Sequence, residues 1–206
     1  NSSAASDVYK RQKQKWLRKF EAMIKLMSLK EGEEVLDVGC ASQIFRPYVE
    51  ERGGIYKGLD ISEGFQPDYV CDAEDMSIIE DNEFDWVVLS DILEHLPNPE
   101  KTIAEAYRIA KKVIAVVPNW YRLERFSFLP RHPGDRHIVR KNPQGWLDEF
   151  RKVGFEITHL RGFFYVPSIA FYPIRPLVAI DLLFRTRPFL MLDEFIDKHF
   201  SDIPLV

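Results

Sequence analysis

The chain has 206 residues, of which 46% are hydrophobic and 29% are charged, and its net charge is -4. This composition is typical of a globular domain and excludes a disordered or fibrous chain, and the acidic balance argues against a nucleic-acid partner. Two isolated cysteines, Cys40 and Cys71, are too few for a disulfide framework or a metal knuckle, which favours a reducing, cytoplasmic location.

The N-terminal stretch SSAASDVYKRQ, residues 2–12, resembles the codon-by-codon translation of a transposase sequencing adaptor. We therefore expect residues 1–12 to be an artefact of a metagenomic fragment, and residues 13–206 to form a single domain. A helix with one apolar face is predicted next, because apolar side chains recur at helical spacing. These side chains are Trp16, Leu17, Phe20, Met23, Ile24 and Met27.

Five short apolar runs then predict β-strands. Their ranges are 34–38, 55–61, 69–71, 84–90 and 112–117. Runs such as WVVLS and VIAVV do not alternate between apolar and polar residues, which is typical of parallel strands that are covered on both faces. Because helices are predicted between these strands, the pattern predicts an α/β fold: a doubly wound, mostly parallel sheet with helices on both faces.

Two of the helices are predicted from the signals at their ends. The first lies between the fourth and fifth strands, and the second follows the fifth strand. The N-terminal signals are Asn98 with Pro99 and Asn142 with Pro143, and the C-terminal signals are Lys111 with Lys112 and Gly154. Both asparagines are predicted to cap their helices through the side chain.

Acidic residues follow the predicted strands, where this fold binds its ligands. They are Asp37, Asp60, Asp72 and Asp91. A carboxylate after the second strand can accept both hydroxyls of a ribose, and one after the third can accept the adenine amino group. The turn after the first strand has one glycine, Gly39, where a dinucleotide fingerprint has three. Because Asp37 would repel a pyrophosphate there, the pattern indicates adenosine that carries positive charge.

Five motifs, in this order, resemble those of class I S-adenosylmethionine-dependent methyltransferases, especially the methyltransferase type 11 and ubiquinone-pathway O-methyltransferase groups: VLDVGCAS, GLDIS, CDAEDM, FDWVVLSDILEHLPNP and VVPN. The resemblance covers about residues 33–157. It implies a Rossmann-like fold and methyl transfer from S-adenosylmethionine to a small-molecule or glycan-type acceptor. The cofactor contacts that it implies are Asp37, Gly39, Cys40, Ala41, Asp60, Ile61, Asp72, Ala73 and Ser90.

Other interpretations of the same residues remain open. The sequence departs from the family at Ala41 and Gln43, where glycines are usual, so a non-catalytic methyltransferase fold that serves as a binding or scaffold module is one alternative. A nucleotide-binding oxidoreductase is another, although the missing glycines disfavour it. Asp60 could instead cap a helix, and Asp72 could form a turn.

Asp91, Glu94 and His95 offer oxygen and nitrogen ligands that can bind a divalent cation. They resemble the E-x-x-E-H cluster of ubiquinone-pathway O-methyltransferases, with Asp91 in place of the first Glu. A hydrogen-bonded strand end that only shapes the pocket is the alternative. His137, on the segment after the fifth strand, is a candidate general base for a hydroxyl acceptor because imidazoles titrate near neutral pH. His95 and Asp91 are the other candidate catalytic residues.

Positive side chains gather between residues 122 and 141, on the segment that follows the fifth strand. They are Arg122, Arg125, Arg131, Arg136, Arg140 and Lys141. Arginine side chains suit an anionic acceptor such as a carboxylate or phosphate. A solvated segment that balances the acidic body explains the same pattern equally well.

The segment at about 163–200 is unusually apolar and is interrupted by prolines. We expect an insertion in the domain, with four roles open: core helices, a lid over the active site, a dimer face, or contact with a membrane surface. Monomer and homodimer therefore both stay open. Charges at Arg175, Asp181 and Arg185 argue against a membrane span. The C-terminal hairpin of the family is predicted to be truncated at Val206.

Overall fold

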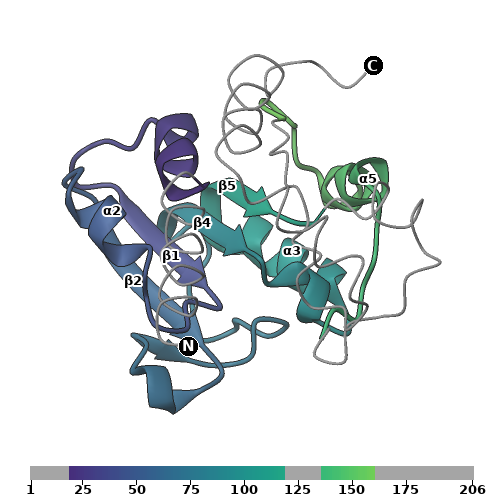
Figure 1. The fold of residues 1–206 in the computed structure, drawn as a ribbon, viewed down its shortest axis with the longest axis horizontal. Coiled ribbons are helices and arrows are strands. Elements are labelled where there is room, and N and C mark those ends of the chain that lie inside the picture. The colour runs from purple at the N-terminus through teal and green to yellow at the C-terminus, as the bar shows by residue number, and fades with distance from the viewer. Residues whose placement is uncertain (1–18, 119–135, 161–206) are drawn as a thin grey trace, which may run out of the picture. The chain divides into compact units, whose positions relative to one another are not determined.

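The computed structural model describes residues 19–118 and 136–160 (Figure 1). The chain divides into two compact units, and residues 19–118 and 136–156 belong to the first. A parallel sheet of five strands forms the centre of this first unit. The strands are β1 Glu34–Val38, β2 Ile55–Asp60, β3 Tyr69–Val70, β4 Phe84–Ser90 and β5 Ala110–Val116.

The strand order in the sheet is β3-β2-β1-β4-β5, and each neighbouring pair is parallel. The chain therefore builds the sheet outward from β1 to one side and then from β4 to the other, and ligands bind such sheets where the order reverses. Val38 near the end of β1 pairs with Leu59 of β2 and with Leu89 of β4. The turns that follow these three strands consequently lie next to one another.

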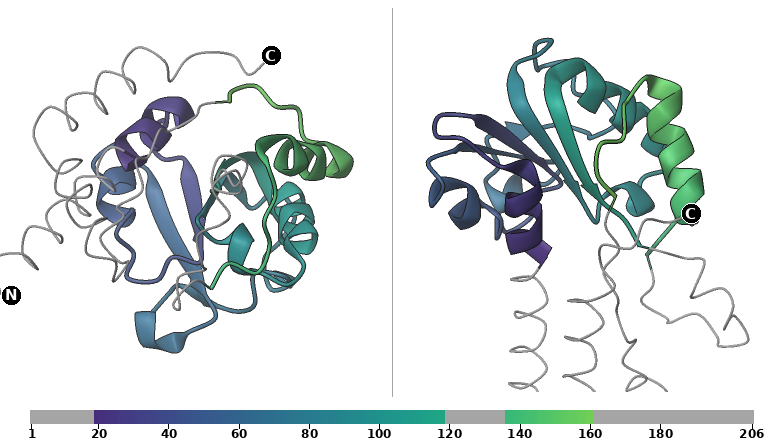
Figure 2. Two further views of the ribbon diagram at one scale, coloured as in Figure 1. Left: turned by 45° about the vertical axis from the view of Figure 1, so that its right-hand side comes forward. Right: turned by 90° about the horizontal axis from the view of Figure 1, so that it is seen from above.

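One face of the sheet is covered by helical residues 19–27 and by helix α2, Arg46–Glu50 (Figure 2). Their apolar side chains pack with residues of the strands in one core, as expected for parallel strands buried on both faces. The core includes Phe20, Met23, Ile24, Met27, Val35, Phe45, Val49, Tyr56, Trp86 and Val88. The predicted apolar helix is thus confirmed from residue 19 onward, while Trp16 and Leu17 lie outside the described residues.

Helices α3, Pro99–Ile109, and α5, Pro143–Val153, cover the other face (Figures 1 and 2). The predicted ends of α5 are confirmed: the side chain of Asn142 accepts the Gly145 N–H at 2.7 Å, and Gly154 closes the helix with a φ of 118°. With helices on both faces of a parallel sheet, the predicted doubly wound fold is confirmed. Within residues 19–118 and 136–160, no helix is long and apolar enough to cross a membrane.

The ends of α3 differ from the prediction. Asn98 stands at the N-cap position, but its side-chain amide donates to Glu74 Oε2 at 2.9 Å and makes no capping bond. Strand β5 begins directly after the helix at Ala110, so Lys111 and Lys112 belong to the strand. Pairing with β4 explains this, because Lys112 lies opposite Trp86 and its ammonium group lies over the indole ring, 4.7 Å from the centroid.

Candidate active site

The turn after β1 has a backbone that favours glycine at three positions. The φ angle is 73° at Gly39, 42° at Ala41 and 55° at Gln43, and this region is disfavoured for residues with a Cβ atom. At Gly39, a Cβ atom would lie 2.7 Å from Cδ1 of Ile92, so a larger residue would have to displace this side chain as well as adopt a strained backbone. At the other two positions the chain keeps the left-handed conformation without glycine.

Asp60, the last residue of β2, is held by two backbone N–H groups. Its Oδ2 accepts from Ala41 at 3.0 Å, and its Oδ1 accepts from Ser62 at 2.9 Å. The bond from Ser62 forms a local turn. It is not the helix cap of the alternative interpretation, because Ser62 itself occupies the N-cap position of the short helix Glu63–Phe65. Because each carboxylate oxygen has two lone pairs, both oxygens can still accept from a pair of hydroxyls.

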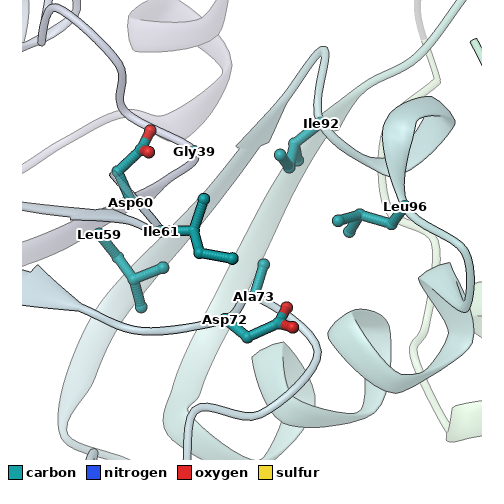
Figure 3. A pocket seen from close by; sticks show the side chains of 8 residues that line it. All are labelled: Gly39, Leu59, Asp60, Ile61, Asp72, Ala73, Ile92 and Leu96. Atoms are coloured by element: carbon teal, nitrogen blue, oxygen red, sulfur yellow. The ribbon is translucent and has the colours of Figure 1, made fainter. Parts of the chain in front are cut away.

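A pocket lies beyond the carboxyl ends of β1 and β2, and Figure 3 shows its side chains. It is lined by Gly39, Leu59, Asp60, Ile61, Asp72, Ala73, Ile92 and Leu96. Two carboxylates among apolar side chains fit an adenosine group. The apolar side chains can pack on the base, while the carboxylates can accept from the ribose hydroxyls and the adenine amino group. Leu59, Ile92 and Leu96 were not predicted, because apolar residues near strand ends look like core residues in a sequence.

Asp37 and Cys40 do not line this pocket. Asp37 is buried, and its carboxylate accepts the hydroxyl of Tyr56 at 2.8 Å. Burial raises the pKa of Asp37 to about 7, although the bond from Tyr56 acts to lower it. The Cys40 thiol is directed toward the core, since a Cβ atom at Gly58 would lie 2.8 Å from its Sγ. Burial raises the pKa of this thiol to about 12, so it is a poor nucleophile.

Ser90 and Asp91, at the end of β4, both contact Lys19 from the first helix. The Lys19 ammonium donates to Ser90 Oγ at 3.0 Å and forms an ion pair with Asp91 Oδ2 at 2.5 Å. Asp91 is therefore directed to this lysine, and its carboxylate is not part of the group formed by Glu94 and His95.

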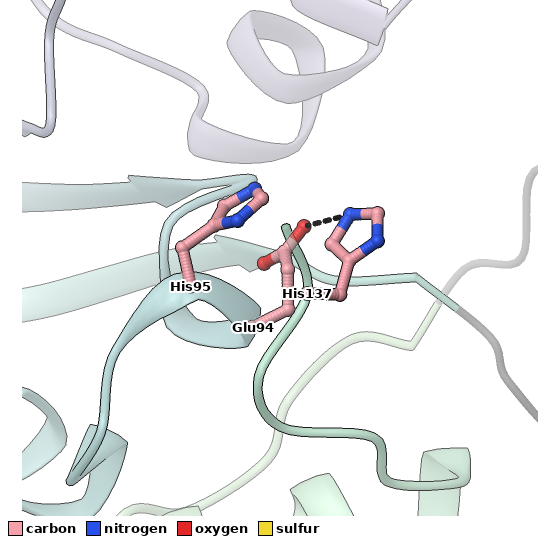
Figure 4. Close-up of side chains that lie close together, drawn as sticks. All are labelled: Glu94, His95 and His137. Atoms are coloured by element: carbon pink, nitrogen blue, oxygen red, sulfur yellow. Dashed lines mark ion pairs between the residues drawn. The ribbon is translucent and has the colours of Figure 1, made fainter. Parts of the chain in front are cut away.

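His137 joins Glu94 and His95 instead (Figure 4). Glu94 and His95 belong to the short helix η2, Leu93–His95. The N–H groups of Ile138 and Val139 donate to the Glu94 carbonyl at 2.8 and 3.0 Å, which holds the segment of His137 beside η2. One ligand atom from each of Glu94, His95 and His137 lies within 4.8 Å of the others. We call these three residues the acid–imidazole cluster.

Glu94 is the most unusual member of this cluster, because it is a carboxyl group that is only 1% exposed. Its Oε1 lies 3.9 Å from Nε2 of His137, and its Oε2 has no hydrogen-bond partner among the residues that the structure describes. Burial, with a smaller contribution from the charge of Asp91, raises the pKa of Glu94 to about 7. A buried carboxyl group without hydrogen-bond partners lowers the stability of the folded state. Carboxyl groups with strongly shifted pKa values gather at functional sites.

A backbone carbonyl orients the ring of His95 within the cluster. Its Nδ1 lies 3.3 Å from the carbonyl oxygen of Arg136, and its ring stacks on that of His137 with centroids 4.7 Å apart. Because a carbonyl can only accept, a hydrogen bond here requires the tautomer with the hydrogen on Nδ1, which leaves Nε2 with a lone pair. Histidines that bind metals are oriented in the same way. The cluster can thus accept a proton or coordinate a cation.

Three of the six positive side chains considered for an anionic acceptor lie outside the described residues: Arg122, Arg125 and Arg131. Lys141 forms an ion pair with Glu149 at 2.6 Å, which ties it to α5. The apolar segment at about 163–200 also lies outside the described part. The anionic acceptor and the roles of that segment therefore stay predictions.

The sequence matches the family model described as "Methyltransferase domain" over residues 9–160. It is similar to the ubiquinone biosynthesis O-methyltransferases of Azoarcus sp. strain BH72 and Thiobacillus denitrificans, each 28% identical over 76% of this chain and 78% of the relative. The fold resembles that of a SAM dependent methyltransferase from Archaeoglobus fulgidus, with a TM-score of 0.55 and 22% identity over 88% of this chain and 86% of that one.

Proposed function

The chain belongs to the methyltransferase domain family and is an S-adenosylmethionine-dependent methyltransferase, and from this premise we propose that it methylates a hydroxyl oxygen of a small-molecule acceptor. The observation that carries the choice of oxygen is the acid–imidazole cluster. A hydroxyl must lose its proton when its oxygen attacks, whereas an amine needs little help. The names of the similar proteins, O-methyltransferases, support the same choice.

The pocket residues would hold the cofactor through its adenosine half. Asp60 would accept from the ribose hydroxyls, and Asp72 would accept from the adenine amino group. The apolar side chains of Leu59 and Ile92 would exclude water from the pocket. S-adenosylmethionine supplies a methyl group that its sulfonium has already activated, so the residues of the chain mainly need to align the acceptor and receive a proton.

His137 would receive that proton from the acceptor hydroxyl. Glu94 faces Nε2 of His137, so its carboxylate would stabilise the imidazolium that forms. This attraction is strong in a buried site because the local dielectric constant is low. His95 would support the pair by stacking on the His137 ring, and Asp91 contributes a negative charge nearby.

A divalent cation is the second candidate occupant of the acid–imidazole cluster. One carboxylate and two imidazoles are ligands that suit zinc, manganese or iron(II), and the hydrogen bond from His95 to the Arg136 carbonyl leaves Nε2 able to coordinate. The chemistry that such an ion supplies is to make a bound hydroxyl more acidic. In this set of candidate ligands, His137 takes the place that the sequence motif predicted for Asp91.

The proposal is tested by product detection with methyl-labelled S-adenosylmethionine. The acceptor panel contains phenols, catechols and sugars, with and without a carboxylate or phosphate, and an amine matched in shape to each phenol. Each reaction is run with and without EDTA. Methylated hydroxyls in both conditions would support proton acceptance by His137, and activity that EDTA removes and one metal restores would support the cation. Binding of S-adenosylhomocysteine without any product would support a scaffold module.

A further inference from the structure

Gln43 has a side-chain role that a glycine could not have. Its backbone φ of 55° is unfavourable for a residue with a Cβ atom. Its Nε2 donates to the carbonyl oxygens of Phe65 and Gln66, at 3.0 Å in both cases. We call this pair of hydrogen bonds the Gln43 bridge. It joins the turn after β1 to the loop after β2.

Arg46 fixes the orientation of the Gln43 amide. Its guanidinium Nε donates to Gln43 Oε1 at 2.9 Å. Because a guanidinium has only donors, Oε1 must face Arg46, and the NH2 group must face the two carbonyls. Arg46 is held in turn by an ion pair to Asp68 at 3.3 Å and by the ring of Tyr56, whose centroid is 4.5 Å from the guanidinium carbon.

The loop that the bridge holds is part of the cofactor pocket. It covers residues 61–66, and its first residue, Ile61, lines the pocket. At the start of this loop Asp60 accepts the N–H of Ala41, and at its end the Gln43 bridge is formed. Ile61 and Phe65 are 72% and 44% exposed, so burial of these side chains does little to fix the loop. The turn therefore holds the loop at both ends.

We propose that Gln43 is a positioning residue for the ribose and adenine half of the S-adenosylmethionine site. The bridge keeps Asp60 and Ile61 in the binding arrangement before the ligand arrives, which lowers the cost of ordering them on binding. This deepens the proposed function and rests on its cofactor site. Gln43→Gly would remove the bridge and also relieve the backbone conformation, so it should weaken binding without weakening the fold.

The test compares wild type, Gln43→Gly and Gln43→Glu in titrations with S-adenosylhomocysteine and with adenosine. Glutamate keeps the side-chain length and the contact to Arg46, but it places an oxygen against the Phe65 and Gln66 carbonyls. We expect Kd to rise about three- to tenfold for both ligands in both variants, as for the loss of one or two hydrogen bonds. Glu50→Gln is the matched control, since Glu50 is an exposed partner of Arg46 at 3.5 Å, and it should bind like wild type.

Two further measurements separate positioning from a merely structural role. The melting temperature of Gln43→Gly should not fall below that of wild type, and hydrogen exchange should accelerate at the amides of residues 62–66 in both Gln43 variants. An unchanged Kd in Gln43→Gly would overturn the proposal. A weaker affinity for S-adenosylhomocysteine with an unchanged affinity for adenosine would also overturn it, because the effect would then lie at the methionine half of the ligand. If wild type binds neither ligand, both the proposed cofactor site and the role of Gln43 fail. If wild type binds and Gln43→Gly binds equally well, only the role of Gln43 fails.

Discussion

The carboxylates at the ends of β1 and β2 differ from the carboxyl group after β4 in how well their hydrogen bonds are satisfied. Asp37 accepts the hydroxyl of Tyr56, and Asp60 accepts two backbone N–H groups. Glu94 is more deeply buried than either, yet one of its oxygens lacks a hydrogen-bond partner in the described part of the chain.

This difference indicates a division of labour between the two regions. A satisfied carboxylate keeps one position with or without a ligand, which suits recognition of a fixed chemical group. An unsatisfied buried carboxyl group lowers the stability of the folded state, and natural proteins tolerate such costs where activity depends on them. We therefore infer that the β1–β2 side recognises the cofactor and that the β4 side acts on the acceptor.

Replacing His137 by alanine tests the β4 side and has the largest expected effect. We expect kcat for a hydroxyl acceptor to fall by about 100- to 10,000-fold, the range that general bases contribute, with little change in KM for S-adenosylmethionine. Steady-state methyl transfer measures both constants. His159→Ala is the control, because His159 is exposed. Unchanged kcat in the His137 variant would end the assignment of chemistry to this side.

Glu94→Gln tests the cost of the unsatisfied carboxyl group through its pH dependence. Because burial raises the pKa of Glu94 from 4.5 to about 7, the folded state binds this proton more tightly than the unfolded chain does. Its contribution to stability is present below about pH 4.5 and is lost as pH rises through about 7, a loss of about 3 kcal/mol. Glutamine avoids this loss, so the variant should melt several degrees higher than wild type at pH 8.

Thermal melts followed by circular dichroism measure this effect, with EDTA present in every sample. At pH 5 the two proteins should differ much less than at pH 8. A variant that melts at or below wild type at pH 8 would mean that Glu94 is satisfied in the folded protein, and the contrast between the two regions would disappear.

Tyr56→Phe makes the opposite change on the β1–β2 side and has the smallest expected effect. It removes the hydroxyl that donates to Asp37, so it leaves a buried carboxyl group less well satisfied and should lower the free energy of unfolding by about 1–2 kcal/mol. Urea denaturation measures the change. Tyr107→Phe is the control, since Tyr107 is 49% exposed. Equal stability of Tyr56→Phe and wild type would show that the bond to Asp37 contributes little.

Short runs rich in apolar residues made β1 and β4 predictable to the residue, because both strands are largely buried on both faces. The start of β5 was not predictable, since pairing of Ala110 with Phe84 extends the strand beyond its apolar run. Asn142 caps its helix as predicted, whereas Asn98 is occupied by Glu74. In each failure, a partner distant in sequence outweighed a local preference.

The candidate site shows the same limit. The short motifs placed Asp60 and Asp72 at the pocket, because both follow strands whose order is set by the fold. They paired Glu94 and His95 with Asp91, whereas Lys19 binds Asp91 and backbone bonds to the Glu94 carbonyl bring in His137. Gln43 could be noticed only as a replaced glycine, since its partners at Phe65 and Gln66 belong to another loop.

Calorimetric titration with S-adenosylhomocysteine of wild type, Asp60→Ala and His137→Ala tests the division of labour most directly, with NAD as the control ligand. We expect micromolar binding by wild type and by His137→Ala, loss of binding in Asp60→Ala, and no binding of NAD. Asp60→Asn, which keeps the shape of the side chain, checks that the loss does not come from unfolding. Full affinity in both Asp60 variants, or loss of binding in His137→Ala, would contradict the division of labour between the two regions.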